Sequence, residues 1–351
     1  MFADKVITWY IENGRQLPWR ETSDPYYIWL SEIILQQTRI EQGRAYYEQL
    51  VKDYPTVIDL ANASEQQILK SWQGLGYYSR ARNLHLAARH IAFDLGGQFP
   101  DTYEGILSLK GVGCYTAAAV ASFAFGLPYP VIDGNVYRLV SRLYNIHTPI
   151  GTGQAYKEFE RLLLRLMDKE RPALFNQALM DFGSLYCKPM GCDCGNCIFA
   201  YECEAKRRGI VDQLPVKASR TPIKERYFYY LDIRWRDPEL TMLMEKRESK
   251  DIWQGLFELP LYETEYPIDY SDLENHLMGV LRDWMGEPPK YLEIGSCMTH
   301  KLTHRTIKAQ FVRAFFENRP KKIPQRMRAI KFSEVKSLPT SRLIDRYLSE
   351  L

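Results

Sequence analysis

The chain has 351 residues, of which 46% are hydrophobic and 25% are charged, a composition typical of a soluble globular protein long enough for two domains. Its net charge of +3 is too small to indicate a nucleic-acid partner by itself. No apolar run is long enough for a membrane span, and the N-terminus does not resemble a secretory signal, so a cytoplasmic protein is expected.

The N-terminal half predicts a series of short helices. Asp24 followed by Pro25 is a strong helix start, because Asp caps the first turn and Pro fits the first helical position. The helix that follows is expected to run from residue 26 to residue 40. Further helices are expected at 3–13, 45–53, 65–72, 117–125, 156–167 and 172–186, with another after the glycine turn at 74–76.

Glu32 lies within the helix predicted after Pro25, between the apolar pairs Trp29-Leu30 and Ile33-Ile34. If its side chain points inward, lost hydration raises its pKa, and the protonated carboxyl can donate a proton to a leaving group near neutral pH. If it points outward, it is an ordinary solvated residue. Periodicity does not separate these alternatives, because apolar residues lie on both sides of it.

A glycine turn, Gly111-Val112-Gly113, precedes a small-residue helix in the middle of the chain. Its glycines allow backbone N–H groups and a helix N-terminus to approach a phosphate closely, so the turn is interpreted as a phosphate clamp. Further along, Asp133 follows an apolar pair and precedes another predicted helix. Asp133 is therefore either the N-cap of that helix or a catalytic acid.

Four cysteines form the strongest local motif. Cys187, Cys194, Cys197 and Cys203 have the spacing C-x6-C-x2-C-x5-C, and four thiolates in one short loop can ligate either a tetrahedral zinc ion or a 4Fe–4S cluster. Zinc sites more often use paired C-x2-C knuckles, so this single C-x2-C with wider flanks favours the iron-sulfur cluster. Cys192 lies in the same loop and complicates the ligand set.

The composition changes after a basic stretch at 206–226, which is expected to be an interdomain linker whose charges are either solvated or in contact with phosphates. Beyond it, strands are expected at 226–236, 240–247 and 305–316. A helix at 271–284 is expected to begin with a capping box of Ser271 and Glu274. The second domain is therefore predicted to be mixed α and β.

Taken in order, these motifs resemble those of the MutY family of adenine DNA glycosylases over nearly the whole chain. The matching segments are 17–20 (LPWR), 25–39 (containing WLSEIILQQTR), 74–84, 111–117, 131–142 (containing VIDGNV), 175–203 and the C-terminal domain with IWQGLFELP at 252–260. The resemblance implies a multi-domain fold. An all-α helix-hairpin-helix glycosylase domain is expected at 1–205 with its cluster loop at 187–203, the linker at 206–226, and an α+β MutT-like or Nudix-like domain at 227–351.

The resemblance assigns the chemistry to two carboxyl groups. Glu32 matches the general acid that protonates adenine N7, and Asp133 matches the acid that stabilises the oxocarbenium-like sugar, with or without a transient covalent bond. Tyr115 stands where related bifunctional enzymes carry a nucleophilic lysine, so base release without strand cleavage is implied. Tyr115 and Asn135 are expected to support Asp133.

Further matching residues are expected to bind substrate or cofactor. Arg20 and Gln177 match residues that contact the extruded adenine, and Trp19 and Leu35 are also expected to bind substrate. The family's cluster ligands correspond to Cys187, Cys194, Cys197 and Cys203, which leaves out Cys192. Residues that match those filling the helix or contacting an opposite 8-oxoguanine are Gln37, Thr38 and Tyr77, and DNA backbone contacts are expected from Gly111, Val112 and Gly113.

The C-terminal domain is expected to recognise 8-oxoguanine. The family loop for this lesion usually has the sequence His-x-Phe-Ser-His, whereas here His300 to His304 has Leu302 and Thr303 at the two central positions. Contact through Thr303 and His304 is expected to persist, with altered discrimination against plain guanine. No R-E-x-x-E-E array follows Gly255, so binding rather than nucleotide hydrolysis is expected.

The resemblance thus implies a monofunctional base-excision-repair glycosylase that removes adenine opposite 8-oxoguanine or guanine in double-stranded DNA. It would act as a monomer at the nucleoid of a bacterial cytoplasm. Two alternatives share some of these motifs: a glycosylase-lyase for oxidised pyrimidines, and a non-catalytic module for DNA binding or electron transfer. Tyr115, in place of a lysine, argues against the lyase.

Overall fold

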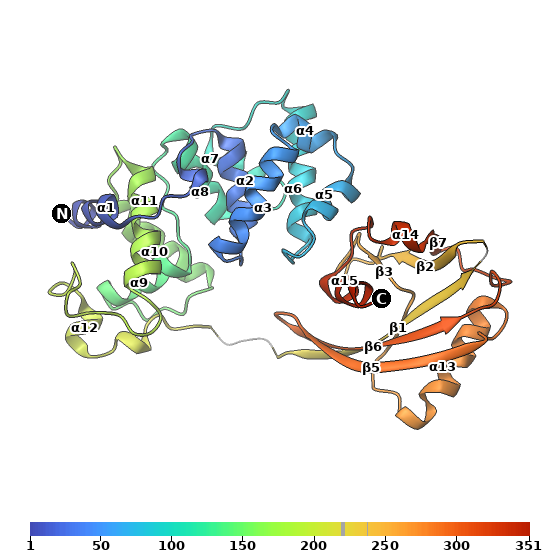
Figure 1. The fold of residues 1–351 in the computed structure, drawn as a ribbon. Coiled ribbons are helices and arrows are strands. Elements are labelled where there is room, and N and C mark those ends of the chain that lie inside the picture. The colour runs from blue at the N-terminus through green and yellow to red at the C-terminus, as the bar shows by residue number, and fades with distance from the viewer. Residues whose placement is uncertain (219–221, 237) are drawn as a thin grey trace. The chain divides into compact units, whose positions relative to one another are not determined.

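The computed structural model describes residues 1–218, 222–236 and 238–351, which fall into two compact units (Figure 1). One unit consists of Met1–Asn62 with Asn83–Arg220, and the other of Ala63–Arg82 with Thr221–Leu351. Residues 219–221 of the predicted linker lie outside the described residues. In the described part of the chain, no helix combines the length and the apolar character that a membrane span requires.

Residues 1–218 are built of helices (Figure 1). They are, in chain order, α1 (Phe2–Asn13), η1 (Pro18–Arg20), α2 (Pro25–Leu35), α3 (Ile40–Asp53), α4 (Val57–Asn62), α5 (Glu65–Ser71), α6 (Ser79–Arg89), η2 (His90–Asp94), α7 (Tyr103–Ser108), α8 (Cys114–Phe125), α9 (Gly134–Tyr144), α10 (Gly153–Leu166), α11 (Pro172–Asp181), η3 (Phe182–Tyr186), α12 (Glu204–Arg208) and η4 (Val211–Gln213).

The start of α2 is as predicted, and its end is not. The Asp24 carboxylate accepts a hydrogen bond from the N–H of Tyr26 at 2.8 Å, which caps the helix. The expected continuation to residue 40 is wrong, because the chain turns at Gln37, whose φ is +57°, and α3 begins at Ile40. The turn brings α3 against α2 so closely that a Cβ on Gly43 would lie 2.7 Å from the Leu35 side chain.

The small residues of α8 allow close helix packing. Ala117, Ala118 and Ala119 are at most 1% exposed, and the helix contacts α2, α7 and α11. This packing places the residues on α2 and α8 side by side across the interior of the unit. The loop after α8 then leads to Asp133 at the start of α9.

The second unit contains a mixed sheet with the strand order β3-β2-β1-β6-β5, in which β1 and β6 are parallel (Figure 1). Beyond this path, β4 pairs with β1 and β7 pairs with β2. The strands are β1 (Lys224–Arg236), β2 (Leu240–Lys246), β3 (Phe257–Glu258), β4 (Leu261–Thr264), β5 (Tyr291–Lys301), β6 (Arg305–Phe315) and β7 (Met327–Lys331), and the helices are α13 (Tyr270–Met285), α14 (Phe332–Val335) and α15 (Arg342–Ser349).

Helices cover both faces of this sheet. Leu273, Leu277 and Leu281 of α13 pack on one face, and residues of α14 and α15 pack on the other. The predicted capping box of α13 is wrong, because the helix begins at Tyr270 with Asp269 as N-cap, which places Ser271 inside the first turn. The α+β class predicted for this part of the chain is confirmed.

Candidate active site

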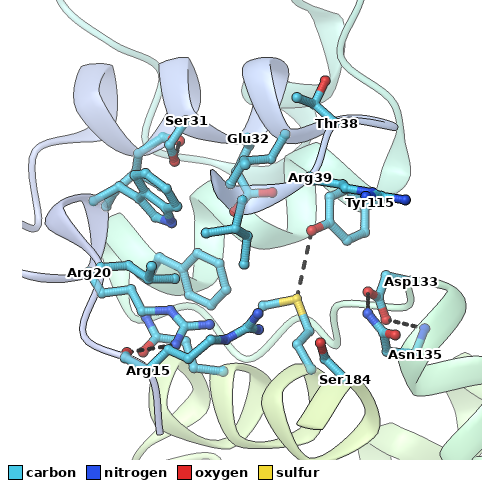
Figure 2. Close-up of a pocket in the computed structure, with 18 of the residues that line it drawn as sticks. Arg15, Arg20, Ser31, Glu32, Thr38, Arg39, Tyr115, Asp133, Asn135 and Ser184 are labelled. Carbon is cyan, nitrogen blue, oxygen red and sulfur yellow. Dashed lines mark hydrogen bonds between the residues drawn. The ribbon is translucent and has the colours of Figure 1, made fainter. Parts of the chain in front are cut away.

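A cavity of about 380 Å³ opens between α2, α8 and α11 in the first unit (Figure 2). It brings together most of the residues predicted to be catalytic or to bind substrate, although they lie far apart in the sequence. Those that line it are Trp19, Arg20, Glu32, Leu35, Thr38, Tyr115, Asp133, Asn135 and Gln177. Gln37, their neighbour in the sequence, is not among the lining residues.

Glu32 lies on the wall of this cavity and is 6% exposed. Of the two orientations that the sequence left open, the Glu32 side chain therefore has the inward one. Burial raises the pKa of Glu32 to about 7, against the opposing influence of a hydrogen bond with Tyr115 and the charge of Arg20. Near neutral pH a substantial fraction of this carboxyl group carries a proton, as a general acid requires.

Asp133 lies across the cavity from Glu32 (Figure 2) and has a different environment. Its carboxylate accepts hydrogen bonds from the backbone N–H groups of Asn135 (2.8 Å) and Val136 (2.7 Å) and from the side-chain amide of Asn135 (2.6 Å). Burial raises its pKa, whereas these donors oppose the rise. Asp133 is thus the N-cap of α9, and it also lines the cavity, so the two predicted alternatives are compatible.

Asn135 is itself fixed by Arg138. The Arg138 guanidinium donates to the side-chain oxygen of Asn135 at 2.9 Å, to the carbonyl of Gly183 at 2.6 Å and to the carbonyl of Cys187 at 2.8 Å. This chain of contacts joins the start of α9 to the first cysteine of the cysteine loop. A Cβ on Gly183 would lie 2.7 Å from the Asn135 carbonyl, so the close approach of η3 to α9 requires glycine there.

Arg20 is held by a carboxylate that the sequence analysis did not identify. Asp181, on α11, is fully buried and accepts from Arg20 at 2.8 and 2.9 Å and also from Arg15. Burial of Asp181 disfavours its charge, but these hydrogen bonds outweigh that effect and lower its pKa to about 2. Gln177 lies one helical turn before Asp181 on α11 and accepts from the Tyr10 hydroxyl at 2.7 Å.

Arg15, Met180 and Ser184 also line the cavity and were missed. Met180 follows Gln177 on α11, and its sulfur accepts from the Tyr115 hydroxyl at 3.7 Å. Helical spacing from Gln177 would have placed Asp181 and Ser184 on the same side of this segment. Arg15 has no comparable sequence signal, because its link to Asp181 spans residues far apart in the chain.

The predicted phosphate clamp lies on the surface between α7 and α8. Gly111 has a φ of +81°, and a Cβ there would lie 2.6 Å from the side chain of Asn83. Gly113 is the N-cap of α8 and is exposed, with no atom within 4 Å of the position a Cβ would take. Val112, between them, donates its N–H to the carbonyl of Leu109 at 3.1 Å. The N-terminal N–H groups of α8 are therefore directed outward.

Tyr77, Thr303 and His304 belong to the second unit. Tyr77 has a φ of +47°, and its hydroxyl forms a hydrogen bond with that of Thr303. Thr303 and His304 are exposed at the turn between β5 and β6. The structure thus brings Tyr77 and Thr303 together within the second unit.

All five cysteines of the loop line a second cavity, together with Arg142 of α9. Arg142 is 2% exposed, and its guanidinium lies 3.5 Å from the sulfur of Cys187 and 3.1 Å from that of Cys192. Across residues 1–218, 222–236 and 238–351, no three His, Cys, Asp or Glu side chains are grouped closely enough to hold a single metal ion. The other cysteines of the set are Cys194, Cys197 and Cys203.

The helical part of the chain matches known repair proteins. Residues 30–167 match the model of the HhH-GPD superfamily base excision DNA repair protein, and residues 233–350 match that of the NUDIX domain. A thermostable thymine-DNA glycosylase of known structure is 30% identical, with a TM-score of 0.55, over 59% of this chain and 95% of that one. The helical fold and these matches define the class of the protein, which is a base-excision DNA glycosylase.

Relatives with similar sequences narrow this class. The adenine DNA glycosylase of Buchnera aphidicola subsp. Baizongia pistaciae is 33% identical over 314 residues, which cover 88% of this chain and 84% of the relative. The human adenine DNA glycosylase is 37% identical over 227 residues, or 62% of this chain and 42% of the human protein. The chain belongs to the adenine DNA glycosylase family and is a DNA N-glycosylase of base excision repair with an attached Nudix-like domain.

Proposed function

We propose that the chain is a monofunctional glycosylase that removes adenine paired with 8-oxoguanine or guanine. The observation that carries this proposal is the pair of carboxyl groups in one cavity. Glu32 has a pKa of about 7, whereas the carboxylate form of Asp133 is stabilised by three N–H donors. Glycoside cleavage needs this division, because one carboxyl group must supply a proton while the other faces developing positive charge.

In the proposed reaction, Glu32 donates its proton to N7 of the extruded adenine. The bond between N9 and C1′ breaks, and its electron pair leaves with the base. Water then adds to C1′ through its oxygen, and the proton that it loses returns Glu32 to the acid form. Asp133 stabilises the oxocarbenium-like sugar, supported by Asn135 and Tyr115. The pKa of Tyr115 is raised well above its usual value by burial and by the two carboxyl groups, so its phenol remains a hydrogen-bond donor.

The remaining cavity residues would hold the base, and those that the structure describes offer no amine for a lyase reaction. Arg20 and Gln177, fixed by Asp181 and Tyr10, offer polar contacts to adenine, and Trp19 and Leu35 offer apolar ones. No lysine is among the described residues that line the cavity. Without an amine nucleophile, no Schiff base with the sugar can form, so the DNA strand should stay intact.

The cysteine loop fits a 4Fe–4S cluster, with Cys187, Cys194, Cys197 and Cys203 as ligands. Zinc sites more often use paired C-x2-C knuckles, whereas here a single C-x2-C has wider flanks, and all four cysteines line one cavity. The cluster would stabilise the loop and supply no step of the hydrolysis.

DNA binding and lesion recognition complete the proposal. The exposed turn Gly111-Val112-Gly113 would bind the DNA backbone, while Thr303 and His304 would contact the base opposite adenine. Gln37, Thr38 and Tyr77 would fill the helix after extrusion. The corresponding domains would be 1–205 for the glycosylase, 206–226 for the linker and 227–351 for lesion recognition, in a monomer that binds duplex DNA.

A single-turnover assay on duplexes with adenine opposite 8-oxoguanine, guanine or thymine tests this proposal. Strand breaks are expected only after alkali, with the fastest release opposite 8-oxoguanine. Breaks without alkali would identify a lyase, and equal rates opposite 8-oxoguanine and guanine would refute lesion recognition.

The Glu32→Gln variant tests the proposed general acid. It should abolish base release while leaving duplex binding intact, because glutamine keeps the shape of the side chain but has no acidic proton to donate. Persistent catalysis would mean that another group is the acid.

A further inference from the structure

The turn between β5 and β6 presents its side chains on a small backbone loop. The N–H of Leu302 donates to the carbonyl of Arg305 at 2.8 Å, and the N–H of Lys224 on β1 donates to the carbonyl of His304 at 3.2 Å. Thr303 and His304 are exposed at its tip. Backbone bonds of this kind fix the strand ends, but a contact with one particular base also needs the orientation of the tip to be fixed.

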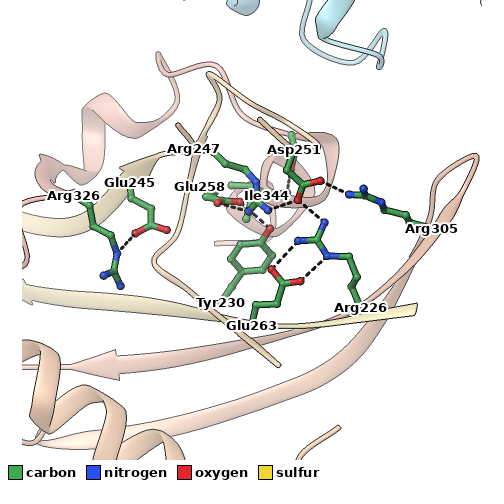
Figure 3. A network of polar contacts seen from close by, with 11 residues as sticks. Arg226, Tyr230, Glu245, Arg247, Asp251, Glu258, Glu263, Arg305, Arg326 and Ile344 are labelled. Carbon is green, nitrogen blue, oxygen red and sulfur yellow. Dashed lines mark hydrogen bonds and ion pairs between the residues drawn. The ribbon is translucent and has the colours of Figure 1, made fainter. Parts of the chain in front are cut away.

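Asp251 lies beside this turn, on the loop that joins β2 to β3 (Figure 3). One oxygen of its carboxylate accepts from Arg305, the first residue of β6 after the turn. The other oxygen accepts from Arg226 on β1 and from Arg247 at 3.0 Å. A single side chain therefore joins the turn to Arg226 of β1 and to Arg247, the residue that follows β2.

Arg226 and Arg247 each have a second carboxylate partner, which fixes them independently of the turn (Figure 3). Arg226 donates two hydrogen bonds to Glu263, at 2.6 and 2.7 Å. Arg247 donates to Glu258 at 2.8 Å, and Glu258 also accepts from the Tyr230 hydroxyl at 3.1 Å. Paired arginine and carboxylate groups of this geometry are strong and directional, so Asp251 is held by the sheet even without Arg305.

The loop that carries Asp251 makes a second contact with the strand before the turn. The ring of Trp253 lies 5.7 Å from the ring of His300, centroid to centroid. Trp253 has a φ of +59°, a conformation that a bulky residue keeps only when its surroundings fix it. The loop is closed by hydrogen bonds between Arg247 and Leu256 (2.9 Å) and between Gly255 and Arg247 (2.8 Å).

We propose that Asp251 is a positioning residue for lesion recognition, which acts through Arg305 to set the orientation of the Thr303-His304 tip. This inference rests on the proposed contact of the tip with the base opposite adenine. The ionised form of Asp251 suits the role, since hydrogen bonds from Arg305 and Arg226 hold its pKa well below the usual range despite burial. Asp251 belongs to the second unit, whereas the proposed chemical step uses Glu32 and Asp133 of the first, so a change at Asp251 should affect discrimination and not the chemical step.

The test is the ratio of single-turnover rates for adenine opposite 8-oxoguanine and opposite guanine. Asp251→Asn keeps the shape and removes the charge that faces three arginines. We expect the ratio to fall roughly tenfold, the loss typical of a broken hydrogen bond to a charged group, while the rate opposite guanine changes less than about twofold. Contacts with phosphates carry no base information and cancel in this ratio.

The matched control is Glu245→Gln. Glu245 lies on β2 of the same sheet, accepts from Arg326 at 2.9 Å and is 12% exposed at its side chain, compared with 22% for Asp251 (Figure 3). This variant removes one charge from a partly buried ion pair that does not reach the turn. It should keep the wild-type ratio, and thermal melting should show both variants folded.

A double-mutant cycle identifies the route of the effect. If Asp251 acts through Arg305, Asp251→Asn combined with Arg305→Gln should lower the ratio no further than the single changes, whereas additive losses would overturn the proposal. Arg305→Gln, at a side chain that is 37% exposed, gives the same test if Asp251→Asn does not fold. If Asp251→Asn keeps the wild-type ratio while His304→Ala lowers it, the role of Asp251 is refuted and the proposed contact of the tip with the base stands. A wild-type ratio in His304→Ala would refute both proposals.

Discussion

Glu32 shows how one side chain couples stability to the conditions of catalysis. Burial raises its pKa from 4.5 to about 7, so the folded state binds this proton more tightly than the unfolded state does. The stabilisation from Glu32 is therefore fully present below a pH of about 4.5 and is lost as the pH rises through about 7. Above that range, the folded protein must hold a buried carboxylate.

We expect Glu32→Gln to be more stable than the wild type at alkaline pH, by roughly 3 kcal/mol at the limit, because glutamine has no charge to bury. The free energies of unfolding of the two proteins should converge below a pH of about 4.5. Urea denaturation across this range measures the difference. Burial also raises the pKa of Glu258 to about 7, so the two proteins are compared at each pH. A difference that does not vary with pH would contradict the buried position of Glu32.

At the scale of elements, two glycines in the turn between α7 and α8 allow the effect of a substitution on stability to be measured separately from its effect on DNA binding. Gly111→Ala would force alanine into a φ of +81° and against Asn83, so we expect a loss of roughly 2 kcal/mol in the free energy of unfolding. Gly113→Ala meets an ordinary φ of −103° and open space, and should change stability by less than about 0.5 kcal/mol.

The affinity for duplex DNA is the second property to compare between Gly113→Ala and the wild type. An added methyl group at Gly113 would lie where a phosphate must approach the N–H groups of α8, so binding should weaken although the fold is intact. Fluorescence anisotropy with an unmodified duplex measures this effect. Wild-type affinity in Gly113→Ala would mean that the turn is not a phosphate clamp.

Elements differ in how well the sequence predicts them, for physical reasons. Local capping predicted the start of α2, because Asp24 and Pro25 act within one turn. The end of α2 depends on the crossing of α3 at Gly43, a tertiary contact that propensity does not include. The orientation of Glu32 was open for a similar reason: residues 28 to 34 are all buried, so the helix has no exposed face there to fix its direction.

The candidate site was also predicted only in part, because contacts between distant segments of the chain cannot be predicted from local sequence. Spacing and motif resemblance gave Glu32, Tyr115 and Asp133, each of which lines the cavity. Asp181 was missed because its role comes from Arg15 and Arg20, more than a hundred and fifty residues earlier in the chain. The partners of Asp251 come from two strands, β1 and β6, and from the loop that follows β2, and only the assembled second unit brings them together.

At the scale of the whole molecule, the cysteine loop joins segments from distant parts of the chain. Arg142 of α9 donates to the carbonyls of Lys188 (2.7 Å), Pro189 (3.1 Å) and Leu214 (3.1 Å), and Lys5 of α1 pairs with Glu202. A cluster that fixes this loop would therefore stabilise the helices around it, because metal binding to a folded site adds to the free energy of folding.

We expect Cys194→Ser to lose iron and the visible absorbance of the cluster, and to unfold at a temperature at least about 4 °C lower, the shift that about 1–2 kcal/mol produces in a unit of this size. Cys192→Ser is the matched control, since Cys192 lies two residues away in the same loop, bonds to Arg142 and Lys188, and is left out of the proposed ligand set. It should keep iron at the wild-type level. Loss of iron from Cys192→Ser with retention in Cys194→Ser would mean that the fifth cysteine is a ligand, whereas zinc in the purified wild type would refute the cluster.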